Sequence, residues 1–195
     1  MASATEPPIR QRPIKRVEYE RLTEQGFFDS DERVELLDGL LVFREPQYAP
    51  HATAVRLAIK ALRAAFGPGW LVDGQLPVAL DDVSEPEPDV AVVAGDARDY
   101  RAAHPTRPVL VLEVAESSLA KDRGLKLALY ARAGLADYWI VNLVDRVLEV
   151  YREPVWSPSS PHRWRYASLF VARPPEGVTP LAAPHAHVAV ADLLP

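Results

Sequence analysis

The sequence predicts one mixed α/β (α+β) domain, in which helices flank a β-sheet. Residues 88–93 and 109–114 are mostly aliphatic and β-branched, which is typical of strands that are buried on both faces. Residues 51–66 instead repeat apolar side chains at helical spacing. With 195 residues, 48% of them hydrophobic and 25% charged, the chain is long and apolar enough for one domain with a real core.

Turn residues and helix-ending residues divide the chain into elements. Asp38-Gly39 lies between two aliphatic runs and predicts a hairpin, and Gly67 ends the helix that begins at His51. Ser117 or Ser118 can cap a later helix. The expected elements, in chain order, are a helix between residues 13 and 26, a hairpin over 36–44, a helix over 51–66, strands over 70–80, 88–93 and 109–114, a helix over 118–133, and strands over 137–141, 147–151, 164–171 and 188–190.

Outside this pattern lie the two ends of the chain. Residues 1–13 are expected to be a flexible arm, and residues 14–195 the domain, of which 156–195 form a proline-rich C-terminal extension. The N-terminus has no apolar core typical of a signal peptide, and no apolar run approaches the ~18–20 residues that cross a bilayer. A cytoplasmic protein without a membrane segment is therefore expected.

Composition limits the chemistry. Cysteine is absent, which excludes disulfides, thiolate zinc sites and cysteine nucleophiles. Any metal must be held by oxygen or imidazole, and an acidic oxygen site suits Mg²⁺, with Mn²⁺ as a substitute. The formal net charge of −5 argues against a protein that holds nucleic acid mainly by bulk electrostatics.

Two acidic residues stand where buried strands are expected. Glu113 interrupts an aliphatic run, and Asp89 opens the strand before it. A buried carboxylate costs several kcal/mol unless it is paired or coordinated. If the two strands pair, both carboxylates converge at one end of the sheet and can hold a divalent cation that activates water against a phosphodiester.

A lysine on the following helix completes the candidate site. Asp122, Lys126 and Tyr130 are spaced at i, i+4 and i+8, so one face of the predicted helix carries all three. The functional interpretation aims this face at the carboxylates, where Lys126 orients the water or neutralises charge on the phosphate. The alternative is an exposed Asp122–Lys126 pair with no catalytic role.

These residues, in this order, resemble the Uma-type restriction endonuclease family within the PD-(D/E)XK nuclease superfamily. The segments that carry the resemblance fall roughly within residues 30–155 and are Val34–Gly39, His51, Glu85–Val90, Val111–Ser118, Asp122-Arg123, Lys126, Tyr130–Gly134 and Tyr138–Val141. The resemblance implies a restriction endonuclease-like mixed sheet flanked by helices, and Mg²⁺-dependent cleavage of DNA. It implies metal ligands at Asp89 and Glu113, and a helix-borne acid at Glu35 that belongs to the catalytic and metal-binding set.

The chain departs from the superfamily pattern at one position. The superfamily lysine normally follows the glutamate by two residues, where this chain has Ala115. The resemblance therefore transfers the lysine's role to Lys126. Asn142 stands where an aspartate commonly follows the preceding strand, which we interpret as a neutral variation.

Several alternatives stay open at this point. Glu35 can equally be a salt-bridging helix residue, Glu87 is a rival ligand to Asp89, and Gln75 and His51 can support the site or have no function. His185 and His187 have a metal-like spacing on a predicted strand, but two histidines without a third ligand are weak grounds for a metal enzyme.

Three hypotheses about function follow. The first is a Mg²⁺-dependent endodeoxyribonuclease, expected as a homodimer because cutting both DNA strands needs two sites. The second is a catalytically silent relative that binds nucleic acid or a protein partner and regulates it. The third is an enzyme with a histidine-bound metal.

Overall fold

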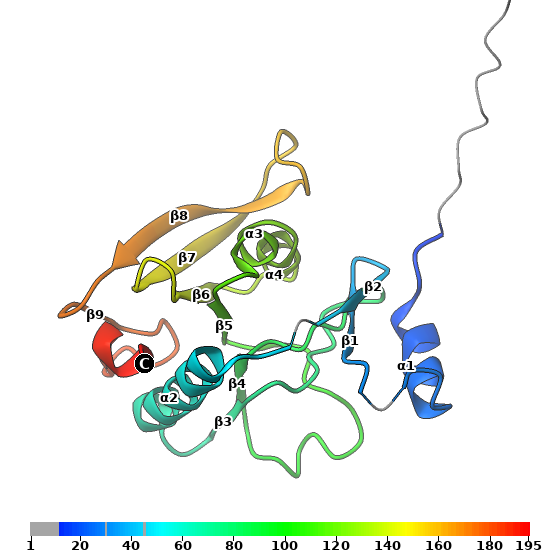
Figure 1. Ribbon diagram of the computed structural model, residues 1–195, viewed down its shortest axis with the longest axis horizontal. Coiled ribbons are helices and arrows are strands. Elements are labelled where there is room, and N and C mark those ends of the chain that lie inside the picture. The colour runs from blue at the N-terminus through cyan, green and yellow to red at the C-terminus, as the bar shows by residue number, and fades with distance from the viewer. Residues whose placement is uncertain (1–11, 30, 45) are drawn as a thin grey trace, which may run out of the picture.

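The computed structural model describes residues 12–29, 31–44 and 46–195, so most of the predicted N-terminal arm lies outside the described residues. Its centre is a six-stranded sheet in the order β3-β4-β5-β6-β7-β8 (Figure 1). The strands are β3 (Trp70–Asp73), β4 (Val90–Ala94), β5 (Leu110–Ala115), β6 (Asp137–Asn142), β7 (Val147–Trp156) and β8 (Trp164–Ala172). Strands β5 and β6 are parallel, whereas the other neighbouring pairs are antiparallel. The predicted mixed α+β fold is confirmed.

Helices cover both faces of this sheet (Figure 1). Helix α2 (Ala49–Phe66) packs on one face through apolar residues such as Val55 and Leu62, which share a core with Leu112 and Val150. A helical segment made of α3 (Leu119–Lys121), η1 (Asp122–Lys126) and α4 (Leu127–Arg132) packs on the other face. Because both faces are covered, strands β5 and β6 are buried along their whole length.

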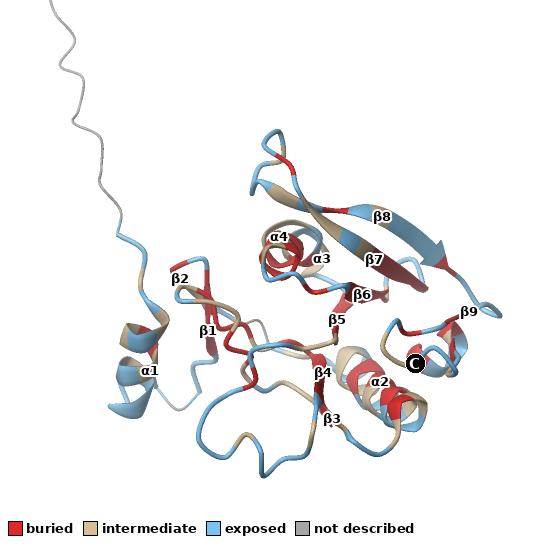
Figure 2. Ribbon diagram, turned by 180° about the vertical axis from the view of Figure 1, so that it is seen from behind, coloured by how far each residue is buried: buried red, intermediate tan, exposed pale blue. Residues whose placement is uncertain are grey.

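A hairpin and a helix form a smaller unit beside the sheet (Figure 2). Strands β1 (Val34–Leu37) and β2 (Leu40–Phe43) are joined by Asp38 and Gly39, whose φ values of 52° and 77° are those of a tight hairpin turn. Helix α1 (Arg16–Glu24) packs on this hairpin through Tyr19, whose hydroxyl donates to the Val34 carbonyl oxygen. The predicted hairpin is confirmed, and it places one face of β1 toward the sheet.

The C-terminal extension belongs to the same domain. It forms the short strands β9 (Gly177–Val178) and β10 (Val188–Ala189) and the 3-10 helix η2 (Val190–Leu193). Residues of these elements join the core beside α2. Among the described residues, no helix is both long and apolar enough to cross a membrane.

Two local predictions are wrong. The strand expected over 70–80 ends at Asp73, because Gln75 adopts a left-handed φ of 57° and the chain leaves the sheet there. Residues 78–80 bond instead to backbone carbonyls of 84, 86 and 105. Ser118 stands at the start of the predicted helix, but its hydroxyl donates to the Asp122 carboxylate over 2.6 Å rather than capping the backbone.

Candidate active site

Asp89 and Glu113 meet because strands β4 and β5 are neighbours. The Asp89 backbone N–H donates to Glu113 Oε2 over 3.3 Å, and the Val114 N–H donates to Asp89 Oδ2 over 2.9 Å. Each carboxylate thus accepts a hydrogen bond from the backbone of the neighbouring strand. Asp89 and Glu113 are only 4% and 3% exposed. The structure brings together the two acids that the sequence singled out.

Lys126 and Tyr130 lie on one face of the helical segment, and both contact the Glu113 carboxylate. Lys126 Nζ lies 3.1 Å from Glu113 Oε1, and the Tyr130 hydroxyl donates to that oxygen over 2.8 Å. Residues 122–126 form a widened π-helical turn immediately before α4. Such turns are rare and frequent at functional sites. The interpretation of Lys126 as an exposed partner of Asp122 is wrong, since the lysine is 2% exposed and bridges buried acids.

Glu35 lies on strand β1, so the expectation of a helix-borne acid is wrong. Leu36 and Leu37, the next two residues of this strand, are fully buried, and Glu35 itself is 0% exposed. Its Oε2 is 3.1 Å from Lys126 Nζ, and its Oε1 is 3.4 Å from Lys121 Nζ. Lys126 therefore joins Glu35 to Glu113. Within the described ranges, no three Asp, Glu or His residues are arranged as a ready-made metal cluster.

Three further side chains surround Asp89. His51 Nε2, at the N-terminal end of α2, lies 3.1 Å from Asp89 Oδ2. Arg44 Nη2 and Gln75 Nε2 each donate to Asp89 Oδ1 over 3.3 Å. His51 and Gln75 thus have the supporting positions that the sequence left open. Arg44 was not predicted, because nothing local to the hairpin indicates a partner that lies 45 residues further along the chain.

The charges in this cluster shift one another's pKa. Burial raises the pKa of Glu113 to about 7, although Lys126 opposes the shift. Burial also raises the pKa of Asp89, but the hydrogen bond and charge of His51, the Val114 N–H and the charge of Lys126 together outweigh it, and the net shift is downward. For Lys126 burial lowers the pKa, yet Glu113 and Glu35 raise it above the usual lysine value. Lys126 is therefore a permanent cation at neutral pH and not a base.

A cavity of about 610 Å³ opens over these residues. Asp89, Glu113 and Lys126 lie on its wall, together with the chain between β2 and α2 and the start of the helical segment. Carboxylates with displaced pKa values beside a cavity of this size are typical of an active site.

The rival ligands lie elsewhere. Glu87 pairs with Arg44 over 2.8 Å and lines a second, smaller cavity beside α1 rather than the one over Asp89. His185 and His187 are exposed and belong to a loop before β10, so the predicted strand does not include them. The histidine-bound metal site therefore has no geometric support within the part of the chain that the structure describes.

Asn142 has a structural role that the sequence did not reveal. Its amide donates to Asp145 Oδ2 over 2.9 Å and to Glu149 Oε1 over 2.8 Å. Glu149 also binds the Arg123 guanidinium. An aspartate at position 142 would face two carboxylates, so the amide suits this position on electrostatic grounds.

Comparisons with known proteins identify the family of this chain and the fold that it shares with a solved structure. The chain belongs to the Uma2 family, described as "Putative restriction endonuclease", whose model matches residues 16–173. A solved structure of a "putative nuclease belonging to DUF820" from Anabaena variabilis is similar, with a TM-score of 0.69 and 15% identity over 93% of this chain and 97% of that chain. At this identity the likeness is one of fold. A search of curated proteins found no match.

Proposed function

We propose that this protein is a Mg²⁺-dependent endonuclease that hydrolyses DNA phosphodiester bonds by direct attack of water, acting in the cytoplasm as a homodimer. The observation that carries the proposal is the meeting of Asp89, Glu113 and Lys126 at the wall of one cavity. Membership of a restriction endonuclease family supports the same class of reaction.

The donor set fits Mg²⁺. This ion typically binds to one or two protein carboxylates and keeps several waters or substrate oxygens. Asp89 and Glu113 offer the carboxylates, and the adjoining cavity leaves room for the remaining ligands. When bound there, Mg²⁺ would supply Lewis acidity and a water of lowered pKa.

The other residues have roles that follow from their contacts. Lys126 keeps its charge, so it stabilises negative charge that develops on the phosphate instead of removing a proton. Glu35 and Tyr130 are positioning residues, since one pairs with Lys126 and the other bonds to Glu113. We assign Glu35 to holding Lys126 rather than to a third carboxylate contact with the ion.

A cleavage assay tests the proposal. Plasmid DNA is incubated with the purified protein and Mg²⁺, Mn²⁺ or EDTA. We expect nicking or linearisation with either metal and none in EDTA. Glu113→Gln and Asp89→Ala should lower the rate at least ~10³-fold, as expected when a metal ligand is removed. Asp82→Ala removes an exposed carboxylate outside the cavity and serves as the control, with unchanged activity.

One observation favours a second function. Asp89 and Glu113 are already paired with Arg44, His51 and Lys126, as expected of a cluster that is only structural. A catalytically silent protein that binds nucleic acid would then retain DNA binding without cleavage. If the wild-type protein binds DNA but cleaves neither DNA nor RNA with Mg²⁺ or Mn²⁺, the endonuclease proposal is rejected in favour of this one.

A further inference from the structure

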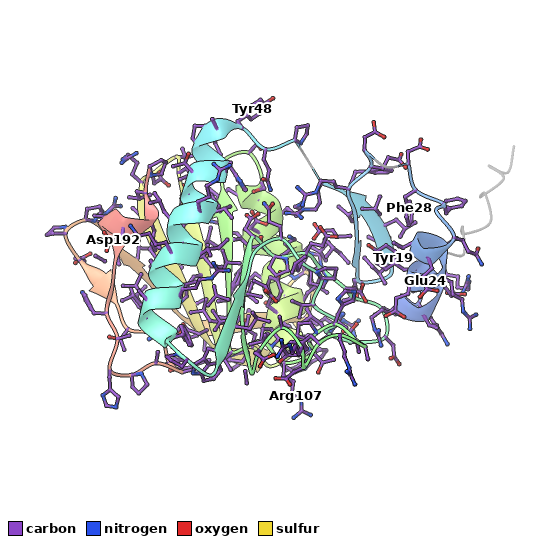
Figure 3. All side chains as sticks on the ribbon, turned by 90° about the horizontal axis from the view of Figure 1, so that it is seen from below. Tyr19, Glu24, Phe28, Tyr48, Arg107 and Asp192 are labelled. Carbon is purple, nitrogen blue, oxygen red and sulfur yellow. The ribbon has the colours of Figure 1, made fainter. Side chains whose placement is uncertain are left out.

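Two aromatic rings at the edge of the cavity are left exposed. Phe43, at the end of β2, is 60% exposed, and Tyr48, just before α2, is 72% exposed. Both line the cavity, and Tyr48 projects beyond the N-terminal end of α2 (Figure 3). By contrast, Tyr130, Tyr138 and Trp139 are completely buried. Two exposed rings that line the same cavity as the acids are available to contact a ligand there.

Two residues near these rings, Arg44 and His51, contact Asp89. Arg44, next to Phe43, turns inward to Glu87 and Asp89, and its side chain is only 8% exposed. His51, one turn after Tyr48, contacts Asp89 from the other end of the segment. Arg44 beside Phe43 and His51 beyond Tyr48 therefore both contact Asp89, which brings the two rings near the acids.

The depth of the acids restricts what can reach them. Asp89, Glu113 and Lys126 are each at most 4% exposed, so a scissile phosphate must enter the cavity to contact them. At about 610 Å³ the cavity has the size of a small-ligand site. A stiff duplex presents two strands on a convex surface, whereas a single strand can bend its backbone into such a cavity with its bases turned out.

Net charge gives an independent reason for recognition by stacking. The formal charge of −5 opposes the approach of a polyanion, so binding to nucleic acid needs a contribution that does not depend on charge. Base stacking on aromatic rings supplies this contribution for any sequence, because every base has a π-face.

We propose that Phe43 and Tyr48 stack on unpaired bases and that the substrate is single-stranded DNA, or DNA with a locally unpaired strand. This inference rests on the proposed nuclease function and adds the substrate class. The bases lie on the two rings while the backbone between them dips toward Asp89 and Glu113.

Binding of a short fluorescein-labelled single strand, with its duplex form for comparison, tests the inference by fluorescence anisotropy in EDTA, where hydrolysis cannot occur. Phe43→Leu and Tyr48→Leu keep an apolar side chain but remove the ring, and Tyr48→Phe keeps the ring. Phe27→Leu is the matched control, because Phe27 is 68% exposed and does not line the cavity. Circular dichroism and thermal unfolding confirm that each variant is folded.

We expect each leucine variant at 43 or 48 to weaken single-strand binding by about five- to thirtyfold, at low and high salt alike. Tyr48→Phe and Phe27→Leu should bind as the wild type does. The fluorescence of 2-aminopurine in the strand should be quenched by the wild type and by Tyr48→Phe, but not by Phe43→Leu or Tyr48→Leu. Equal losses for duplex and single strand, or losses no larger than that of Phe27→Leu, would overturn the inference.

The outcome separates this inference from the proposed function. Mg²⁺-dependent cleavage by the wild type with no effect of the leucine variants rejects the stacking and leaves the nuclease. Ring-dependent binding without any cleavage rejects the nuclease and leaves the stacking.

Discussion

Asp89 and Asp137 are both buried carboxylates at the start of strands in the same sheet, but their surroundings differ. Asp137 accepts hydrogen bonds from Trp139 Nε1 (2.7 Å), Arg152 Nε (2.8 Å) and the Leu181 backbone N–H (2.8 Å). It fastens the C-terminal extension to β6, and it does not line the cavity. Asp89 is also well bonded, yet it is interlocked with a second acid and lies at the cavity.

Asp89 and Asp137 differ in position more than in burial. Burial and ion pairing are common to both residues and therefore do not indicate function. Asp89 and Glu113 differ from Asp137 in that each accepts a hydrogen bond from the backbone beside the other acid, and both line the same cavity. The proximity of Asp89 and Glu113 at one cavity, rather than the burial of either, is therefore the reason for proposing a site there.

The largest effect on stability is expected at the centre of the cavity group. Lys126→Met removes the cation that pairs with both Glu113 and Glu35, and each acid is left buried. We expect the free energy of unfolding to fall by about 3–5 kcal/mol. Urea unfolding followed by tryptophan fluorescence measures this change. The double variant Lys126→Met/Glu35→Gln should recover part of the lost stability. A loss below ~1 kcal/mol in Lys126→Met alone would show that Glu35 and Glu113 do not depend on Lys126.

A smaller loss of stability, without loss of activity, is expected at the structural carboxylate. Asp137→Asn weakens the pairing with Arg152. It also replaces one of the two carboxylate oxygens that accept from Arg152, Trp139 and Leu181 with an NH₂ group. The free energy of unfolding should fall by about 2–3 kcal/mol, while DNA cleavage per folded molecule stays the same. The matched Asp89→Asn variant should lose DNA cleavage as well as stability, because Asp89 also accepts from Arg44, Gln75 and the Val114 N–H. Equal loss of cleavage in both variants would show that Asp89 has no more direct part in cleavage than Asp137.

The smallest effect concerns pH. Burial and the neighbouring Glu20 raise the pKa of Glu85 to about 7, although Arg16 opposes the shift. Because the folded-state pKa lies above the unfolded value of 4.5, the stabilisation is complete below pH 4.5 and is lost as the pH rises through 7. Glu85→Gln should match the wild type in stability near pH 4 and exceed it by about 1–2 kcal/mol at pH 8.

Urea unfolding of both proteins across this pH range checks the prediction. Glu85→Gln keeps the size of the side chain and removes only its ability to ionise. A stability difference that stays constant from pH 4 to pH 8 would contradict the assigned titration.

The fold was largely predictable because its signals are local. Aliphatic runs predicted strands β4 and β5, and the dipeptide Asp38-Gly39 predicted the hairpin. The exit of the chain from the sheet at Gln75 was not predictable, since a left-handed glutamine followed by alternating apolar residues still has the pattern of a strand. Leu76 in this pattern is in fact 52% exposed.

The site was predictable only in part, for a similar reason. Asp89 and Glu113 are conspicuous because each places a charge in or beside a buried strand, and Lys126 was reached through helical spacing and the family resemblance. Arg44 and the strand position of Glu35 depend on how the hairpin packs against the sheet, which is a contact between distant segments that leaves no local pattern.

We propose that Asp89 and Glu113 jointly bind a divalent cation, and titration with Mn²⁺ followed by electron paramagnetic resonance measures this binding. We expect one bound ion per chain, an affinity at least ~10-fold weaker in Glu113→Gln, and an unchanged affinity in Asp137→Asn. Absence of binding in the wild type, or equal binding in Glu113→Gln, would contradict it.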